Sequence, residues 1–169
     1  MIPSPGARPP RCRLVNLATG EEMACLMNPT QLTERLAVQW NRVAVPGLPF
    51  SPLQYQNSSN RQLVGVEFYL DGFPATPPTP AKDLLAFRSF LRALTIPPPR
   101  AAGVAMVAPP RVLLLWPGVV TMECVIASVE LQYKQFGVDG SVLVYTATVT
   151  FEEVLDVRAS VAGAFEELA

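Results

Sequence analysis

The chain has 169 residues, with 13 lysines and arginines against 14 aspartates and glutamates, no histidine, and a net charge of −1. This length fits a single domain that can bury a core without disulfides. The near-neutral charge without a basic cluster argues against nucleic acid or an anionic membrane as a partner. The absence of histidine excludes Ser-His-Asp and Cys-His catalytic sites and histidine-ligated metals.

The composition favours a protein that makes protein contacts. Hydrophobic residues make up 50% of the chain and charged residues 16%, whereas about 25% charged is typical. A large, tightly packed monomer core is the alternative reading. Glycine-rich phosphate-binding loops are absent from the sequence, and adjacent carboxylates on a strand point to opposite faces. We therefore expect no enzyme activity, no cofactor and no metal.

Residues 1–11 form a proline-rich N-terminal segment. It has no apolar run of the kind a signal peptide needs, so we expect the chain to be cytoplasmic at synthesis. Residues 12–28 read as a hairpin around a glycine-containing turn, and 35–45 read as a further strand. Prolines in 46–52 predict an extended segment. Residues 62–72 alternate, which predicts a strand whose buried side chains are Val64, Val66, Phe68 and Leu70.

Residues 80–95 form the one strongly predicted helix. Its apolar residues recur at helical spacing as Leu84, Phe87, Leu91 and Leu94, and prolines follow from position 97. Residues 100–110 then form a long apolar loop, and loops of this kind are usually either functional or disordered.

Three further strands are predicted over 111–117, 119–136 and 141–154, with a turn at Asp139-Gly140. The last strand alternates sharply. One face carries Thr146, Thr148 and Thr150, and the other is apolar from Tyr145 to Phe151. Residues 155–169 form a tail that could make a weak helix.

Cys12, Cys25 and Cys124 lie far apart in the sequence and are expected to be buried free thiols.

These elements predict an α+β, mainly β fold: an antiparallel barrel-like sandwich with one amphipathic helix, over a domain at 12–154. The same stretch resembles the tube-like N-terminal domain of contractile injection system baseplate proteins. The resemblance rests on motifs that occur in the family's order: Thr19-Gly20-Glu21, Asn28-Pro29-Thr30, Trp40, Val45-Pro46-Gly47-Leu48, Asp71, Pro109-Pro110, Trp116-Pro117, and the hairpin bearing Tyr133, Phe136, Asp139 and Gly140.

The resemblance implies a phage-tail-tube-like protein that forms a ring with itself, as a hexamer, at the baseplate of a phage-tail-like particle. It implies contacts with a spike or hub protein and an inner tube protein, and also with baseplate wedge or sheath proteins. Thr146, Thr148 and Thr150 would face the lumen or wall, and Val104, Met106 and Val107 would form an inter-subunit loop. Many relatives carry a C-terminal LysM module, and we expect a member without it.

Two other classes stay open at this point. A β-barrel module that binds a small ligand or a protein is the alternative function, because an apolar sandwich with loops could hold a ligand. An enzyme is the third class. Assembly is expected in the cytoplasm, in a particle that is either released or anchored to a cell.

Overall fold

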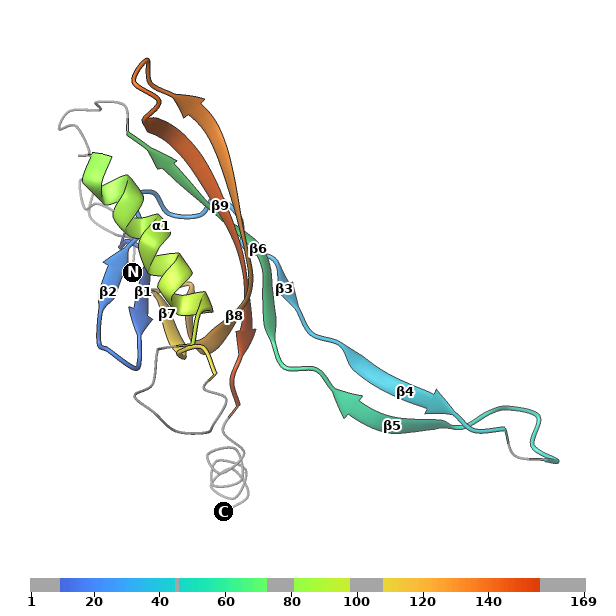
Figure 1. Ribbon diagram of the computed structural model, residues 1–169. Helices are drawn as coiled ribbons and strands as arrows, with labels where there is room; N and C mark the ends of the chain where they lie inside the picture. The colour runs from blue at the N-terminus through green and yellow to red at the C-terminus, as the bar shows by residue number, and fades with distance from the viewer. Residues whose placement is uncertain (1–9, 45, 73–80, 98–107, 156–169) are drawn as a thin grey trace.

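The computed structural model describes residues 10–44, 46–72, 81–97 and 108–155 (Figure 1). Their elements, in chain order, are β1 (Arg13–Asn16), β2 (Glu22–Ala24), β3 (Glu34–Arg35), β4 (Val38–Arg42), β5 (Leu53–Ser58), β6 (Gln62–Asp71), α1 (Ala81–Thr95), β7 (Val112–Trp116), β8 (Val120–Phe136) and β9 (Val142–Glu153).

The strands form a seven-stranded antiparallel sheet of order β2-β1-β7-β8-β9-β6-β3 and a separate two-stranded sheet of β4 and β5. Helix α1 lies against one face of the large sheet (Figure 1). The predicted class, mainly β and antiparallel with one helix, is confirmed. Within the described residues the sheet remains open and does not close into a barrel.

The core lies between α1 and the sheet. The predicted helix face is confirmed, because Leu84, Phe87, Leu91 and Leu94 are each at most 2% exposed. The Phe87 ring packs against that of Phe68 in β6 at 5.6 Å between centroids. Burial of this apolar stripe stabilises α1 far more than its helix propensity does.

Strand β6 differs from the prediction at its start. Leu63 is fully buried, whereas Val64 is only half-buried, so the expectation that Val64 belongs to the core was wrong. The register between β6 and β9 shifts between Leu63 and Val66, and Gly65 has a φ of 65°. A bulge with glycine in the left-handed region inserts one residue and reverses the alternation before it.

The run predicted as one strand over 35–45 is divided into β3 and β4, and β5 was not predicted at all. The alternation in Leu53-Gln54-Tyr55-Gln56 was the available signal. The prolines nearby led to a reading of the whole stretch as extended loop. The consequence is a hairpin that the sequence reading did not contain.

The β8–β9 hairpin turns as predicted. Gly140 has a φ of 78°, a conformation that glycine adopts without strain. The Asp139 carboxylate accepts hydrogen bonds from the Ser141 hydroxyl at 2.6 Å and its backbone N–H at 3.1 Å. These bonds lower the pKa of the Asp139 carboxyl and hold the turn closed.

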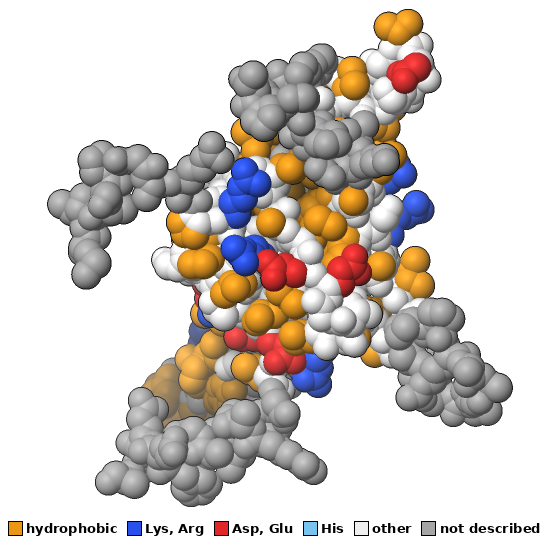
Figure 2. All heavy atoms as spheres, turned by 90° about the vertical axis from the view of Figure 1, so that its left-hand side faces the viewer, with side chains coloured by type: hydrophobic (Ala, Val, Ile, Leu, Met, Phe, Trp, Pro, Cys, Tyr) orange, Lys and Arg blue, Asp and Glu red, His pale blue; other side chains and the backbone are white. Residues whose placement is uncertain are grey.

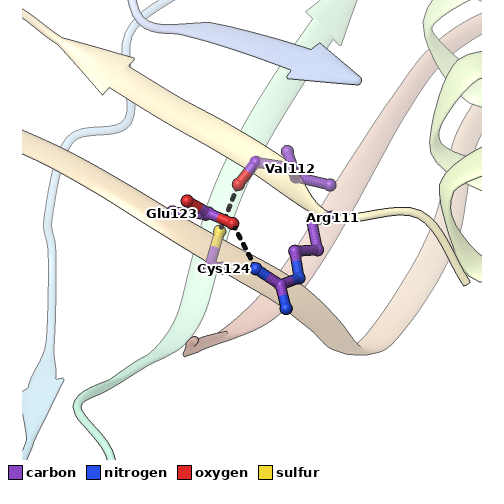
Figure 3. A network of polar contacts seen from close by, with 4 residues as sticks. All are labelled: Arg111, Val112, Glu123 and Cys124. Atoms are coloured by element: carbon purple, nitrogen blue, oxygen red, sulfur yellow. Dashed lines mark hydrogen bonds and ion pairs between the residues drawn. The ribbon is translucent and has the colours of Figure 1, made fainter. Parts of the chain in front are cut away.

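Strands β7 and β8 form a second tight hairpin, and Figure 3 shows the polar contacts between them. On its exposed side Arg111 forms an ion pair with Glu123 at 2.9 Å. On the core side the Cys124 thiol donates a hydrogen bond to the Val112 carbonyl oxygen at 3.4 Å. Burial raises the pKa of the Cys124 thiol to about 12, which keeps it protonated and unreactive at neutral pH.

Candidate assembly surface

The two faces of β9 differ as the sequence predicted. Tyr145, Ala147, Val149 and Phe151 are fully buried on the side of α1. The Tyr145 hydroxyl donates a hydrogen bond to the backbone carbonyl oxygen of Leu84 in α1, and burial raises the pKa of Tyr145 to about 12. The helix is therefore fixed to β9 by apolar contact and by one buried hydrogen bond.

The opposite face of β9 carries Thr146, Thr148 and Thr150. Thr146 is only 3% exposed, and its hydroxyl has no hydrogen-bond partner among the described residues. Thr148 is half-buried, and the Thr150 hydroxyl accepts a hydrogen bond from the Gly65 N–H at 3.3 Å. The threonine side chains are therefore partly covered by longer side chains on the neighbouring strands, and a molecule on this face would contact those side chains as well.

Those neighbours come from β6 and β8, because cross-strand partners share a face. Thr148 lies between Glu67 and Glu130, which are both exposed. Thr146 lies between Tyr69 and Gln132, and Ser128 lies beside Thr150. We call this set, Thr146, Thr148, Thr150, Glu67, Tyr69, Ser128, Glu130 and Gln132, the threonine face. It is a wettable surface with a carboxylate on either side of an uncharged central row.

Strand β8 has an open edge. It spans 17 residues, but β7 pairs with it only over Val120–Cys124, while β9 occupies its other side. Beyond Cys124 the edge that faces away from β9 has no strand partner among the described residues. A surface groove of about 400 Å³ runs along this edge, lined by Ile126, Val129 and Leu131 from β8 and by Leu91 and Arg92 from α1.

Strand β6 has the complementary open edge, on the other side of β9. Strand β3 pairs with it only at Gln62 and Leu63, and the Val64 N–H donates a hydrogen bond to the Thr33 carbonyl oxygen at 2.9 Å. From Val66 to Asp71 that edge has no strand partner in the part of the chain that the structure describes. The three strands β8, β9 and β6 thus form a sheet with two open edges, which other chains can extend.

The β4–β5 hairpin, which we call the arm, projects away from the large sheet (Figure 1). Every residue of both strands is exposed. Trp40 lies opposite Tyr55 with ring centroids 5.7 Å apart and with Leu53 on the same face, whereas Asn41 and Gln54 share the other face. A lone two-stranded hairpin is only marginally stable in water, so an arm that exposes Trp40, Tyr55 and Leu53 on one face is suited to contact another protein.

Figure 2 shows the side of the molecule that carries α1. Hydrophobic side chains are interspersed there with acidic and basic ones, and no single charge dominates the face. Leu85 of α1 is 43% exposed, and Ile96, which follows the helix, is 59% exposed.

The structure brings the three predicted threonines together on one face, while Val104, Met106 and Val107 lie outside the described residues. The sequence reading missed the arm and the open edge of β6. The length of the predicted strand over 119–136 was the signal for the open edge of β8, because the predicted strand before it, over 111–117, is too short to pair with all of it. Within the described ranges, no group of three or more Cys, Asp or Glu side chains could hold a metal ion.

A family model described as contractile injection system tube protein matches residues 15–162. The match covers α1, the arm and the large sheet except for the first two residues of β1, and so includes all the surfaces described above. No curated protein matches the sequence. Among the described residues, no helix is long and apolar enough to cross a membrane.

Proposed function

The chain belongs to the contractile injection system tube protein family, and from this premise we propose that it forms a ring at the baseplate, joining the central spike to the inner tube. Members of the family are structural proteins and not enzymes, so the protein is a structural component of such a particle. The position within the particle and the ring itself are the proposal.

The pair of open edges carries the proposal. Strands β8 and β6 are both antiparallel to β9, so they run in the same direction. If the β8 edge of one copy pairs with the β6 edge of the next, rotation about one axis repeats the contact and closes a ring without remaining edges. Closure would satisfy the backbone N–H and C=O groups that the monomer exposes there.

Such a ring has one wall with two faces, and their chemistry supports one orientation. Helix α1 covers the apolar face, so the threonine face is left to line the lumen. Hydroxyl and carboxylate groups such as those of Thr148, Glu67 and Glu130 keep a channel wet and offer no apolar contact that would retain a passing molecule. Thr146, Thr148 and Thr150 are then lumen-facing residues, as the family resemblance implies.

The arm supports assembly through a second contact. It leaves the sheet from the β3 and β6 side, which in the proposed ring is the side that meets the next copy (Figure 1). Docking of Trp40, Tyr55 and Leu53 against that copy would bury apolar area that is exposed in the isolated chain. The apolar sequence of the loop with Val104, Met106 and Val107 supports it as a second proposed contact to an adjacent subunit.

The proposed copy number is that of a hexamer, with a spike or hub protein on one side of the ring and the inner tube protein on the other. Contacts with baseplate wedge or sheath proteins would come from the outer face, which carries α1. The family resemblance supports these partners, and the open edges support the ring.

Hydrogen–deuterium exchange with residue resolution tests the proposed ring. Amides along the open edges, over 126–136 in β8 and 66–71 in β6, should exchange quickly in the isolated chain and slowly in assembled particles. Amides of β9 serve as the internal control, because β9 is paired with β6 on one side and with β8 on the other, so its amides should be protected in both states. Edge amides that exchange equally fast in the two states would rule out closure through these strands.

A further inference from the structure

Two of the three cysteines meet across the start of the β1–β2 hairpin. Arg13 pairs with Ala24, so Cys12 and Cys25 are the next pair outward. The Cys25 N–H donates a hydrogen bond to the Cys12 carbonyl oxygen at 2.8 Å. Both side chains are 1% exposed and lie in the same core cluster. The two thiols therefore face each other from directly opposed positions.

This placement suits a disulfide. Opposed residues on antiparallel strands have Cβ atoms about 4.5–5.5 Å apart, and a disulfide needs about 3.5–4.5 Å, so a small approach of the two strands is enough. A hydrogen bond between the thiols lowers the pKa of Cys12 and raises that of Cys25. Cys12 is therefore the better nucleophile of the pair.

The third cysteine provides a contrast within the same molecule. Cys124 is also fully buried, but its thiol donates to the Val112 carbonyl oxygen and not to another thiol (Figure 3). Its raised pKa disfavours the thiolate. Burial alone thus does not distinguish the pair, whereas thiol-to-thiol placement does.

We propose that Cys12 and Cys25 form an oxidation site, closing to an intrachain disulfide when the protein meets a low-molecular-weight disulfide such as oxidised glutathione. The Cys12 thiolate attacks one sulfur of the oxidant, which releases the first glutathione thiolate and leaves a mixed disulfide. The Cys25 thiol then loses its proton to solvent and attacks the Cys12 sulfur, which releases the second glutathione. The protein loses two electrons and two protons, and the oxidant becomes two thiols.

The disulfide would add a covalent link to hydrogen bonds that already join Pro10 and Cys12 to Asn28. The Cys12 N–H donates to the Asn28 side-chain oxygen at 2.8 Å, and the Asn28 amide donates to the Pro10 carbonyl oxygen at 3.0 Å. Strand β2 has only three residues and lies at the edge of the sheet, so local opening there gives the oxidant access. The covalent link would reduce that opening and stabilise the hairpin.

The experiment is an equilibrium measurement on the full chain. Reduced, denatured protein is refolded in a series of reduced and oxidised glutathione mixtures, quenched with an alkylating agent, and read by intact mass and peptide mapping. A parallel series stays in guanidinium chloride. We expect the Cys12–Cys25 link to form in the folded protein at a ratio of oxidised to reduced glutathione about tenfold or more below that of the unfolded chain. The oxidised protein should also melt at a higher temperature than the reduced one.

Matched variants separate the site from general thiol oxidation. Cys124→Ser should leave the link and its midpoint unchanged, whereas Cys25→Ala should abolish the link. If the folded and unfolded chains close at the same ratio, the fold does not favour the disulfide and the proposal is overturned. Persistent glutathione adducts on Cys12 of the unmutated folded protein would overturn it as well, because Cys25 would then be unable to resolve them.

Discussion

Replacing Phe87 with alanine should strongly destabilise the domain, because this side chain joins α1 to the sheet. Phe87 is 2% exposed, and its ring lies 5.6 Å from that of Phe68 at an interplanar angle of 59°. Phe68 in turn meets Phe151 edge-on at 6.5 Å. Truncation would leave a ring-sized cavity between the helix and the centre of the sheet.

The expected loss is worked from those contacts. A buried phenylalanine truncated to alanine costs about 3–5 kcal/mol, and the tilted contact with Phe68 adds about 0.5–1.5 kcal/mol beyond burial, which places Phe87→Ala in the upper part of that range. A domain of this size shifts its melting temperature by about 2–4 °C per kcal/mol. The variant should therefore melt roughly 10 °C or more below the unmodified protein.

Denaturation in guanidinium chloride, followed by circular dichroism, gives the free energy of unfolding for comparison. Leu85→Ala is the matched control, because Leu85 is 43% exposed on the same helix and should lose less than about 1 kcal/mol on truncation. A Phe87→Ala variant within 1 kcal/mol of the unmodified protein, or a Leu85→Ala variant that loses as much as Phe87→Ala, would refute the packing of α1 described here.

Three further predictions concern β9 and the arm. Val149→Asp places an unpaired charge at a fully buried position and should cost several kcal/mol, whereas the conservative change Thr148→Ser should cost well under about 1 kcal/mol; equal losses in a denaturation series would contradict the two faces. Burial raises the pKa of Tyr145 from the ordinary value of 10 to about 12, so the folded state holds this proton more tightly than the unfolded state does. The resulting contribution to stability is fully present below pH 10 and is lost as the pH rises from 10 to 12. Over that interval the free energy of unfolding should fall by up to about 1.4 kcal/mol per pH unit, and Tyr145→Phe should remove this part of the slope. Trp40→Ala should leave the melting temperature unchanged but weaken self-association measured by native mass spectrometry. Asn41→Ala, on the other face of the arm, should change neither the melting temperature nor the self-association.

Local sequence patterns were sufficient for the elements that meet the core. Spacing alone identified the buried side of α1, and the period of two in β9 identified Val149 and its neighbours as core residues. Both patterns report directly on burial of one face, which is the strongest signal a single sequence carries. The turn at Asp139-Gly140 was equally predictable, because its backbone geometry requires glycine.

The features that failed depend on information that a single segment does not hold. Val64 was misplaced because the bulge at Gly65 depends on pairing with β9 as well as on the strand's own pattern. Thr146 is buried because longer neighbours on β6 and β8 flank it, which only the register reveals. The arm was missed because an exposed strand buries no face in its own chain, so its pattern carries meaning only in an assembly.

Electron cryomicroscopy of assembled particles from cells that produce this protein tests the central claim most directly. The account predicts a closed ring of this chain between the spike and the inner tube, in which the β8 edge of each copy pairs with the β6 edge of the next. Thr146, Thr148 and Thr150 should line the lumen, and α1 should face outward. A chain that sits in the particle as separate monomers, or a ring that turns α1 toward the channel, would contradict it.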